Sequence, residues 1–294
     1  MAAGRRTPSG AGIGLRRRHF AELERRGFDL GRALDFFELI PENYLAGEPG
    51  AVARGGRYLD VLDACAERWP ILVHGVSVSI GGPDPLDHGY LAKLRALLDR
   101  IGAPFYTDHL CFATIAGRPT FDLLPLPFTE AAVRHTAARL RELADALDRP
   151  VAVENISYYA QMPGAELDEP DFVRAVVEEA DCMLLLDVNN VFVNARNHGL
   201  DPREQLWRLP VERACQIHLA GHLREGPRLL DNHGSAVCSE VWDLYREVIA
   251  ARGPIPTLIE WDTHIPELDE VLDQADLARA ILFEAVAEPE QESA

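Results

Sequence analysis

The stretch Ile71-Leu-Val-His74-Gly-Val-Ser-Val78 is the part of the sequence that decides the fold. Its apolar residues occupy both faces of an extended chain, which is typical of a parallel strand covered by helices. Seven comparable runs occur in the 294 residues. Together they predict eight strands, at residues 12–15, 36–40, 71–78, 104–107, 151–153, 183–187, 215–218 and 257–260.

Helical patterns separate these runs. Asp84-Pro85 and Thr129-Glu130 have the composition of helix starts, and apolar spacing over residues 268–282 predicts an amphipathic last helix. Eight alternations of strand and helix favour a single-domain (β/α)₈ barrel, which typically needs about 250 residues. We expect the barrel at residues 11–286, a flexible N-terminus at 1–10 and a flexible acidic tail at 287–294.

Composition narrows the functional classes. The formal charge of −18 opposes nucleic-acid binding, because that function needs an excess of Lys and Arg. No apolar run approaches the roughly 18 residues that a membrane span requires. The five cysteines form no CxxC pair, which fits reduced thiols in the cytoplasm.

Metal-binding residue types recur at the ends of the predicted strands. In a (β/α)₈ barrel, the carboxyl ends of all strands surround one site. Any one such residue is commonly a hydrogen-bonded cap or a solvated loop residue, so their joint occurrence carries the inference. The segments are His74, Asp108-His109, Glu154-Asn155, Asp187-Val-Asn189-Asn190, His218, Asp231-Asn-His233 and Glu260-Trp-Asp262.

These residue types indicate metal rather than a thiolate or nucleophile site. Glu154 and Glu260 directly follow apolar residues, and a buried carboxylate without a cation or strong donors is costly. Imidazole with carboxylate is a ligand set for iron, zinc or manganese. Eight or nine ligands exceed the needs of one ion, so we predict two or three ions with bridging carboxylates.

A second group of residues is expected to orient ligands or bind substrate. Its members are polar and lie beside the predicted ligands or in the loops after the strands. They are Glu42, Asn43, Asp108, Asn155, Asn189, His222 and Asp262.

Several of these segments together resemble a known family. They are Asp35-Phe-Phe-Glu-Leu-Ile-Pro-Glu-Asn43, His74-Gly-Val-Ser77, Thr107-Asp-His-Leu110, Val153-Glu-Asn155, Leu186-Asp-Val-Asn-Asn190, Gln216-Ile-His-Leu-Ala-Gly-His222, Asp231-Asn-His233 and Leu258-Ile-Glu-Trp261. In this order they resemble the multinuclear non-heme iron-dependent oxidases, a family that includes the methanobactin-maturing oxidase. The resemblance extends from about Gly12 to Leu282.

The resemblance implies a triosephosphate-isomerase-type barrel with two or three irons of mixed ferrous and ferric state. It also implies dioxygen as cosubstrate and the oxidative modification of a ribosomally made peptide, commonly at cysteine, often with a small partner that binds the peptide's leader. Carried over by position, the ligands are His74, His109, Glu154, Asp187, Asn190, His218, Asp231, His233 and Glu260.

Three other functions remain open from the sequence. The ligand order is also similar to the trinuclear endonuclease IV barrel, although Asn190 stands where that family has histidine and the acidic charge opposes a DNA substrate. A sugar isomerase on the same barrel would want a lysine near the metal, and Lys93, the only lysine, falls on a predicted helix. A metal-sequestering protein without turnover is the third.

Overall fold

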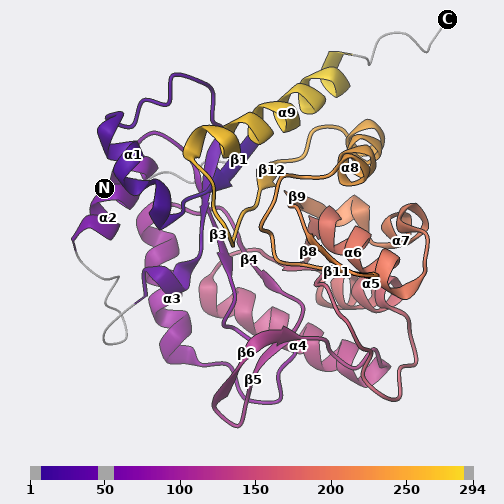
Figure 1. The fold of residues 1–294 in the computed structure, drawn as a ribbon. Coiled ribbons are helices and arrows are strands. Elements are labelled where there is room, and N and C mark those ends of the chain that lie inside the picture. The colour runs from indigo at the N-terminus through magenta and orange to yellow at the C-terminus, as the bar shows by residue number, and fades with distance from the viewer. Residues whose placement is uncertain (1–7, 46–55, 288–294) are drawn as a thin grey trace, which may run out of the picture.

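Eight parallel strands form a closed barrel in a computed structural model that describes residues 8–45 and 56–287 (Figure 1). Each strand pairs with two neighbours, in the order β1, β12, β9, β8, β7, β4, β3, β2 around the barrel. The barrel class predicted from the sequence is therefore confirmed. The bounds are β1 Ala11–Gly14, β2 Phe36–Leu39, β3 Ile71–Gly75, β4 Tyr106–His109, β7 Val151–Glu154, β8 Met183–Asp187, β9 Ala214–Leu219 and β12 Thr257–Ile259.

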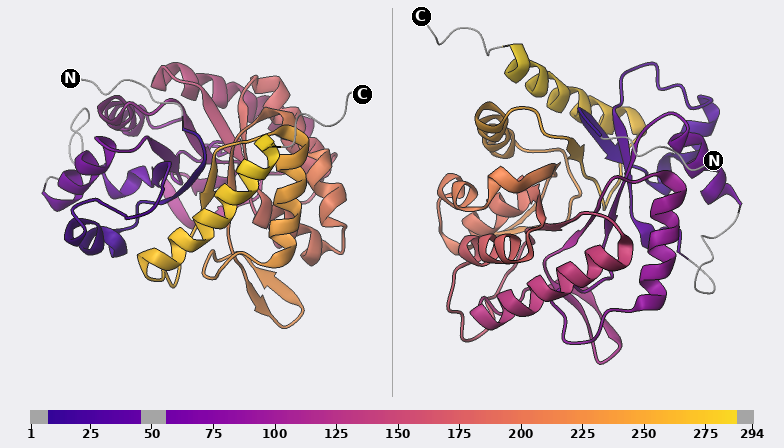
Figure 2. Two further views of the ribbon diagram at one scale, coloured as in Figure 1. Left: turned by 90° about the horizontal axis from the view of Figure 1, so that it is seen from above. Right: turned by 180° about the vertical axis from the view of Figure 1, so that it is seen from behind.

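Helices surround the barrel and connect successive strands, as the views from above and behind show (Figure 2). Short 3-10 turns at Arg17–His19, Pro41–Asn43 and Val211–Arg213 complete the connections. The helices are α1 Phe20–Arg25, α2 Arg57–Ala66, α3 His88–Ile101, α4 Glu130–Leu147, α5 Glu169–Ala180, α6 Val188–His198, α7 Pro202–Arg208, α8 Ser239–Arg252 and α9 Leu268–Ala287.

Two small hairpins extend the loops at the carboxyl ends of β4 and β9. They are β5–β6 (Phe112–Ile115 and Arg118–Leu124) and β10–β11 (Leu223–Glu225 and Arg228–Leu230). Figure 1 shows β5–β6 at the lower end of the molecule. Neither hairpin was predicted from the sequence, because β6 and β10 are largely exposed and lack the continuous apolar runs of the barrel strands.

One predicted helix start is wrong and one is confirmed. Thr129 caps α4 by accepting a hydrogen bond from the Ala132 N–H. Asp84 does not start a helix, since α3 begins at His88 and is capped by Asp87. The Asp84 carboxylate instead accepts the N–H groups of residues 116 and 117, which form the turn of the β5–β6 hairpin.

Several strand ends also differ from the prediction by one to three residues. The third strand ends at Gly75 rather than at residue 78, and the fourth runs from Tyr106 to His109 rather than over 104–107. The pairing of His109 with Glu154 across β4 and β7 fixes the register of the fourth strand. Apolar runs do not contain this information, because a strand can end within or beyond its apolar stretch.

The core has two parts. A large apolar cluster fills the space between strands and helices, and a small one contains Phe36, Leu72, Phe105 and Leu258. Side chains two residues apart on a strand share a face. The residues that follow these at a spacing of two are Glu38, His74, Thr107 and Glu260, so the barrel interior changes from apolar to polar along the strands.

Parts of the predicted flexible ends, residues 1–7 and 288–294, lie outside the described residues, and their flexibility stays a prediction. Within residues 8–45 and 56–287, no helix has the length and apolar character needed to cross a membrane.

Candidate metal centre

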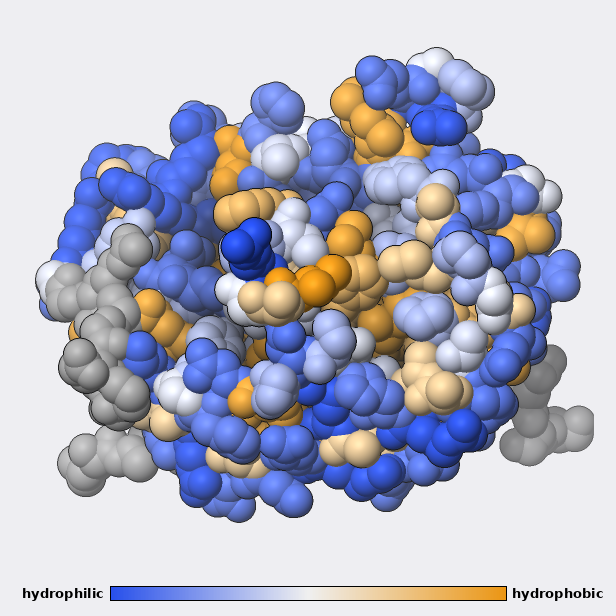
Figure 3. Space-filling model, turned by 90° about the horizontal axis from the view of Figure 1, so that it is seen from below, coloured by the Kyte–Doolittle hydropathy of each residue, from blue (hydrophilic) through white to orange (hydrophobic). Residues whose placement is uncertain are grey.

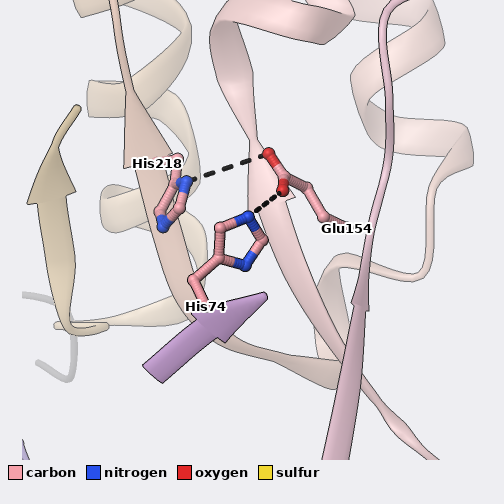
Figure 4. Close-up of side chains that lie close together, drawn as sticks. All are labelled: His74, Glu154 and His218. Atoms are coloured by element: carbon pink, nitrogen blue, oxygen red, sulfur yellow. Dashed lines mark ion pairs between the residues drawn. The ribbon is translucent and has the colours of Figure 1, made fainter. Parts of the chain in front are cut away.

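Glu154, at the end of β7, lies at the centre of the polar layer. Its Oε2 atom lies 2.9 Å from Nε2 of His74 on β3 and 3.2 Å from Nε2 of His109 on β4. Its Oε1 atom lies 3.8 Å from Nδ1 of His218 on β9. Figure 4 shows the carboxylate of Glu154 directed toward both His74 and His218. Four strands that are far apart in sequence therefore bring one carboxylate and three imidazoles together.

A second group joins the first through His218. Nδ1 of His218 lies 2.8 Å from Oε2 of Glu260, the residue that follows β12. The polar ligand atoms of Glu154, Asp187, His218 and Glu260 all lie within 4.8 Å of one another. All four residues are buried. This arrangement could hold a metal ion.

A third group lies on the outer side of Glu260. Nδ1 of His233 lies 3.2 Å from Glu260 and 3.3 Å from Asp262, and its Nε2 lies 2.7 Å from Asp231. His233, Glu260 and Asp262 form another set that could hold an ion. The three candidate sets overlap, because each of three residues belongs to two of them. These residues are Glu154, His218 and Glu260.

Local structure places Asp187 and Asn190. Strand β8 continues directly into α6, and Asp187 caps this helix by accepting the N–H of Asn190 on Oδ1. Its Oδ2 atom is left facing the cluster, 3.8 Å from Nε2 of His233. Asn190 donates its side-chain amide N–H to the carbonyl of Asn155, which leaves its Oδ1 atom without a hydrogen bond among the described residues.

Eight of the nine predicted ligands are thus linked by contacts of 4 Å or less, and the ninth, Asn190, hydrogen-bonds Asp187. The structure brings all nine to one place at the carboxyl ends of the strands. Their roles as ligands remain a prediction.

The electrostatics of the cluster reflect the competition between burial and neighbouring charge. Burial would raise the pKa of Glu154, but the imidazoles of His109 and His74 lower that pKa to about 2. Burial would lower the pKa of His74, but Glu154 and Glu38 raise it to about 9. The pKa of Asp187 is raised well above its usual value, by burial and by the charges of Glu154, Asp231 and Glu260, despite the opposing effect of His233.

The buried cluster fits metal cations on two grounds. Six carboxylates meet only four imidazoles and the guanidinium of Arg16, so negative charge is in excess when all six acids are ionised, even with every imidazole protonated. The carboxylates and imidazoles are Glu38, Glu154, Asp187, Asp231, Glu260, Asp262, His74, His109, His218 and His233. Asp187 Oδ2 and Asn190 Oδ1 are also buried oxygen atoms that make no hydrogen bond within the described residues. Buried atoms of this kind are rare in proteins unless they bind something.

Hydrogen bonds orient two of the imidazoles, His109 and His74, so that one nitrogen of each faces Glu154. His109 donates its Nδ1–H to the carbonyl of Gly75 at 3.0 Å, because a carbonyl can only accept. Nδ1 of His74 lies 2.8 Å from the hydroxyl of Thr107. In both rings Nε2 is directed at Glu154, which is the usual arrangement of histidines that bind metal.

Glu38 and Arg16 belong to the centre but were not predicted as site residues. Glu38 is buried in β2, and its Oε1 atom lies 3.2 Å from Nε2 of His218, the ring nitrogen that faces away from Glu260. A carboxylate inside an otherwise apolar strand was the signal available in the sequence. Arg16 pairs with Asp262 and lies 3.7 Å from Glu260. Its position in a loop after β1 gave no such signal.

The structure divides the residues predicted to assist the ligands. Asp262 lies in the cluster itself. Asn155 exchanges two hydrogen bonds with the backbone of Asp187, and Asn189 donates to Asp231 while its Oδ1 contacts Nδ1 of His222.

The remaining three predicted residues lie outside the cluster. Glu42 accepts hydrogen bonds from Tyr90 and from the Val76 N–H, and Asp108 accepts one from Tyr106. The exposed Asn43 lines the cavity above the cluster.

A large cavity of about 1270 Å³ opens onto the cluster. His74, His109, Asn190, Asp231, His233 and Glu260 are among its lining residues. The other walls include the β5–β6 hairpin, the loop after β7 and the arginines that follow β1. Several candidate ligands are therefore accessible to a molecule that enters from outside.

These features define a class of protein: a (β/α)₈ barrel with a buried histidine and carboxylate cluster at the carboxyl ends of its strands, able to hold metal ions. Two solved structures have a similar fold. D-psicose 3-epimerase from Clostridium cellulolyticum H10 matches with a TM-score of 0.57 and 9% identity, over 95% of this chain and 97% of that chain. D-allulose 3-epimerase from Methylomonas sp. matches with a TM-score of 0.54 and 14% identity, over 98% of this chain and 99% of that chain. Identities this low show a shared fold alone.

The sequence comparisons identify the family. Residues 10–283 match the model of the RiPP precursor modification enzymes MbnB/TglH/ChrH, where RiPP denotes a ribosomally synthesised, post-translationally modified peptide. UPF0276 proteins from Anaeromyxobacter sp. (strain Fw109-5) and Pseudomonas aeruginosa (strain PAO1) are 43% and 44% identical to this chain, covering 96% and 93% of it and 96% and 92% of their own lengths. The chain belongs to this family of peptide-modifying enzymes, as the sequence motifs indicated.

Proposed function

We propose that this protein is an oxygen-dependent multinuclear iron enzyme that oxidises a ribosomal precursor peptide, at a cysteine. The observation that carries the proposal is the position of the cluster at the base of the 1270 Å³ cavity. Pockets for small molecules typically measure about 300–1,000 Å³, so this cavity has room for a peptide segment. Family membership supports a precursor peptide as the substrate.

The proposed ligands are His74, His109, Glu154, Asp187, Asn190, His218, Asp231, His233 and Glu260. Glu154 and Glu260 each belong to two overlapping sets, which supports two or three ions joined by shared carboxylates. Imidazole with carboxylate suits iron, and the resemblance to iron oxidases favours iron over zinc or manganese.

Bound iron, in mixed ferrous and ferric states, would supply the reduction of dioxygen and the removal of electrons from the substrate. The residues of this chain would supply position and charge. Glu38, beside Nε2 of His218, would hold that ring with Nδ1 toward the metal. Asn155 and Asn189 would fix Asp187 and Asp231 in the same way. We also propose that a small partner protein holds the leader of the peptide outside the cavity.

The test uses the purified protein loaded with iron and a cysteine-bearing precursor peptide encoded beside its gene. We expect oxygen consumption together with a change in peptide mass, and loss of both in His74→Ala and Glu154→Ala. His88→Ala is the matched control, because His88 lies on the surface beside Glu142. Full activity with zinc in place of iron, or in the absence of oxygen, would reject an oxidative function.

A further inference from the structure

We propose that Arg17 binds a carboxylate of the substrate at one rim of the cavity and so sets the direction in which the peptide crosses the metal cluster. This inference deepens the proposed function and rests on it for the nature of the substrate. It assigns a specificity role to a residue that lies outside the cluster.

Arg16, Arg17 and Arg18 all line the cavity, but their charges are not equally available. Arg16 pairs with Asp262, and Arg18 pairs with Glu267 at 2.6 Å. Arg17 is exposed, and within residues 8–45 and 56–287 no carboxylate lies within 4 Å of it. A cation on a cavity wall without a paired anion is suited to bind one from the substrate.

The surroundings of Arg17 hold its guanidinium in place. The group lies over the ring of Tyr58, 5.6 Å from the ring centre. Tyr58 is itself packed edge-on against Phe20 and Tyr44, with ring centres 5.5 and 6.0 Å apart. A guanidinium stacked on an aromatic ring keeps its N–H groups free to bind a carboxylate in a bidentate way.

The opposite rim has a different character. It includes Phe121 and Leu124 of the β5–β6 hairpin and Tyr159 of the loop after β7. Phe121 is 93% exposed and has a φ of 59°, a strained conformation for a residue other than glycine. Figure 3, seen from below, shows hydrophobic residues gathered around the hollowed centre of the face on which the hairpin lies.

The barrel order places these two rims across the cluster from each other. Arg17 follows β1, and β7 stands four strands away from β1 in either direction around the ring, with β4 beside it. A peptide with its carboxylate at Arg17 and apolar residues at the hairpin would therefore pass directly over Glu154 and His74.

The carboxylate could be the C-terminal group of the peptide or an acidic side chain. Three hexapeptides with an uncharged, carboxylate-free BODIPY label distinguish these sources: Ala-Phe-Ala-Gln-Ala-Ser with a free C-terminus, the same peptide amidated, and the amidated peptide with Glu in place of Gln. Binding to the metal-loaded enzyme is measured under argon by fluorescence anisotropy. Serine replaces cysteine, so the measurement does not depend on iron redox chemistry.

We expect at least one carboxylate-bearing peptide to bind about tenfold more tightly than the neutral one, which corresponds to about 1.4 kcal/mol. Arg17→Gln should abolish the difference, while Arg17→Lys should keep part of it. Arg246→Gln is the control, because Arg246 is an exposed arginine on α8. Thermal unfolding of each variant shows whether it folds as the wild type does.

Equal affinity for all three peptides would overturn the proposal, as would failure of all three to bind at millimolar concentration. A preference for carboxylate that persists in Arg17→Gln would also overturn it, because the carboxylate would then bind the metals or another residue. The proposed function fails separately, on iron and oxygen. If turnover proves independent of oxygen while Arg17→Gln still loses the preference, the carboxylate site stands in an enzyme of another reaction class.

Discussion

Two buried carboxyl groups, Glu154 and Glu169, show opposite responses to their surroundings. Burial acts on both, but the imidazoles of His109 and His74 lower the pKa of Glu154 to about 2. Glu169, at the start of α5, is a partly exposed residue whose carboxyl group faces inward and accepts the amide N–H of Asn194 on both oxygens, at 3.0 and 3.1 Å. Burial raises its pKa to about 8.

The opposite pKa shifts of Glu154 and Glu169 show that neighbouring charge decides whether a buried carboxyl group is ionised. An enclosed carboxylate whose hydrogen-bond partners are neutral, as Asn194 and Tyr158 are for Glu169, becomes a protonated acid near neutral pH. One that meets several imidazoles stays ionised, and ionised carboxylates are what metal ions bind. The metal centre is therefore distinguished from the Glu169 site by the type of its neighbours rather than by burial.

The largest effect is expected from removing the charge of Glu154. Glu154→Gln should lower oxygen-dependent turnover by at least about 100-fold, the upper end of what changes around metal ligands typically cost. Metal analysis should show the loss of bound iron. Glu169→Gln is the matched control and should keep its iron. Normal iron content in Glu154→Gln together with loss of iron in Glu169→Gln would contradict the proposal that Glu154 binds the metal.

Removing the metal should destabilise the whole protein. Because carboxylates outnumber imidazoles in the cluster, chelator treatment leaves like charges buried together. A ligand present at about 100 to 1,000 times its dissociation constant contributes roughly 3–4 kcal/mol, so we expect a fall in Tm of about 5–10 °C. Differential scanning calorimetry measures it.

The Glu154 and Glu169 variants test whether the loss of stability on chelation comes from the metal cluster. Glu169→Gln should lose as much stability on chelation as the wild type, and Glu154→Gln should lose less. An unchanged Tm after complete removal of metal from the wild type would contradict the account.

A smaller effect is expected at Glu38, which touches His218 on the side away from Glu260. Glu38→Gln preserves a hydrogen-bond acceptor but removes the charge that supports the imidazole. We expect metal affinity to fall by about tenfold, the low end of the range for such residues. Titration with ferrous iron under anaerobic conditions measures this, and Glu67→Gln, on an exposed residue after α2, should behave as the wild type.

The smallest effect is expected on the free energy of unfolding when Glu169 is replaced, and this effect depends on pH. Its pKa rises from about 4.5 in the unfolded chain to about 8 in the folded protein, so between these values the folded state binds the extra proton. The stability from this group is therefore fully present below pH 4.5 and is lost as pH rises through 8.

Urea unfolding at pH 5, 7 and 9 tests that expectation. Glu169→Gln should match the wild type at pH 5 and exceed it at pH 9 by about 1–2 kcal/mol, allowing for the partial exposure of the residue. A difference that is the same at all three pH values would contradict the assignment of this shift to Glu169.

Much of the fold and of the side-chain cluster at the candidate metal centre was predictable from sequence, for physical reasons. Parallel strands that are buried on both faces leave apolar runs, and the carboxyl ends of such strands converge, so His74, Glu154, Asp187 and His218 could be placed together. Helix caps are less certain, because Asp84 and Asp87 both precede plausible helix starts and tertiary contacts decide between them.

The residues missed are those whose role depends on pairing across the fold. Glu38 contacts a residue 180 positions away, and Arg16 one 246 positions away, and no local pattern reports either contact. The hairpin that carries Phe121 was missed because its longer strand, β6, is largely exposed and has no continuous apolar run. Glu42 and Asp108, which were predicted to bind substrate or to orient ligands, accept hydrogen bonds from the hydroxyl groups of Tyr90 and Tyr106.

The most direct test of the central claim is X-ray diffraction from iron-loaded crystals at wavelengths on either side of the iron absorption edge. The account predicts two or three anomalous peaks among Glu154, His218 and Glu260, with His74 and His233 at the outer positions. Iron bound only elsewhere on the protein, with these side chains paired to one another as imidazolium and carboxylate, would contradict it.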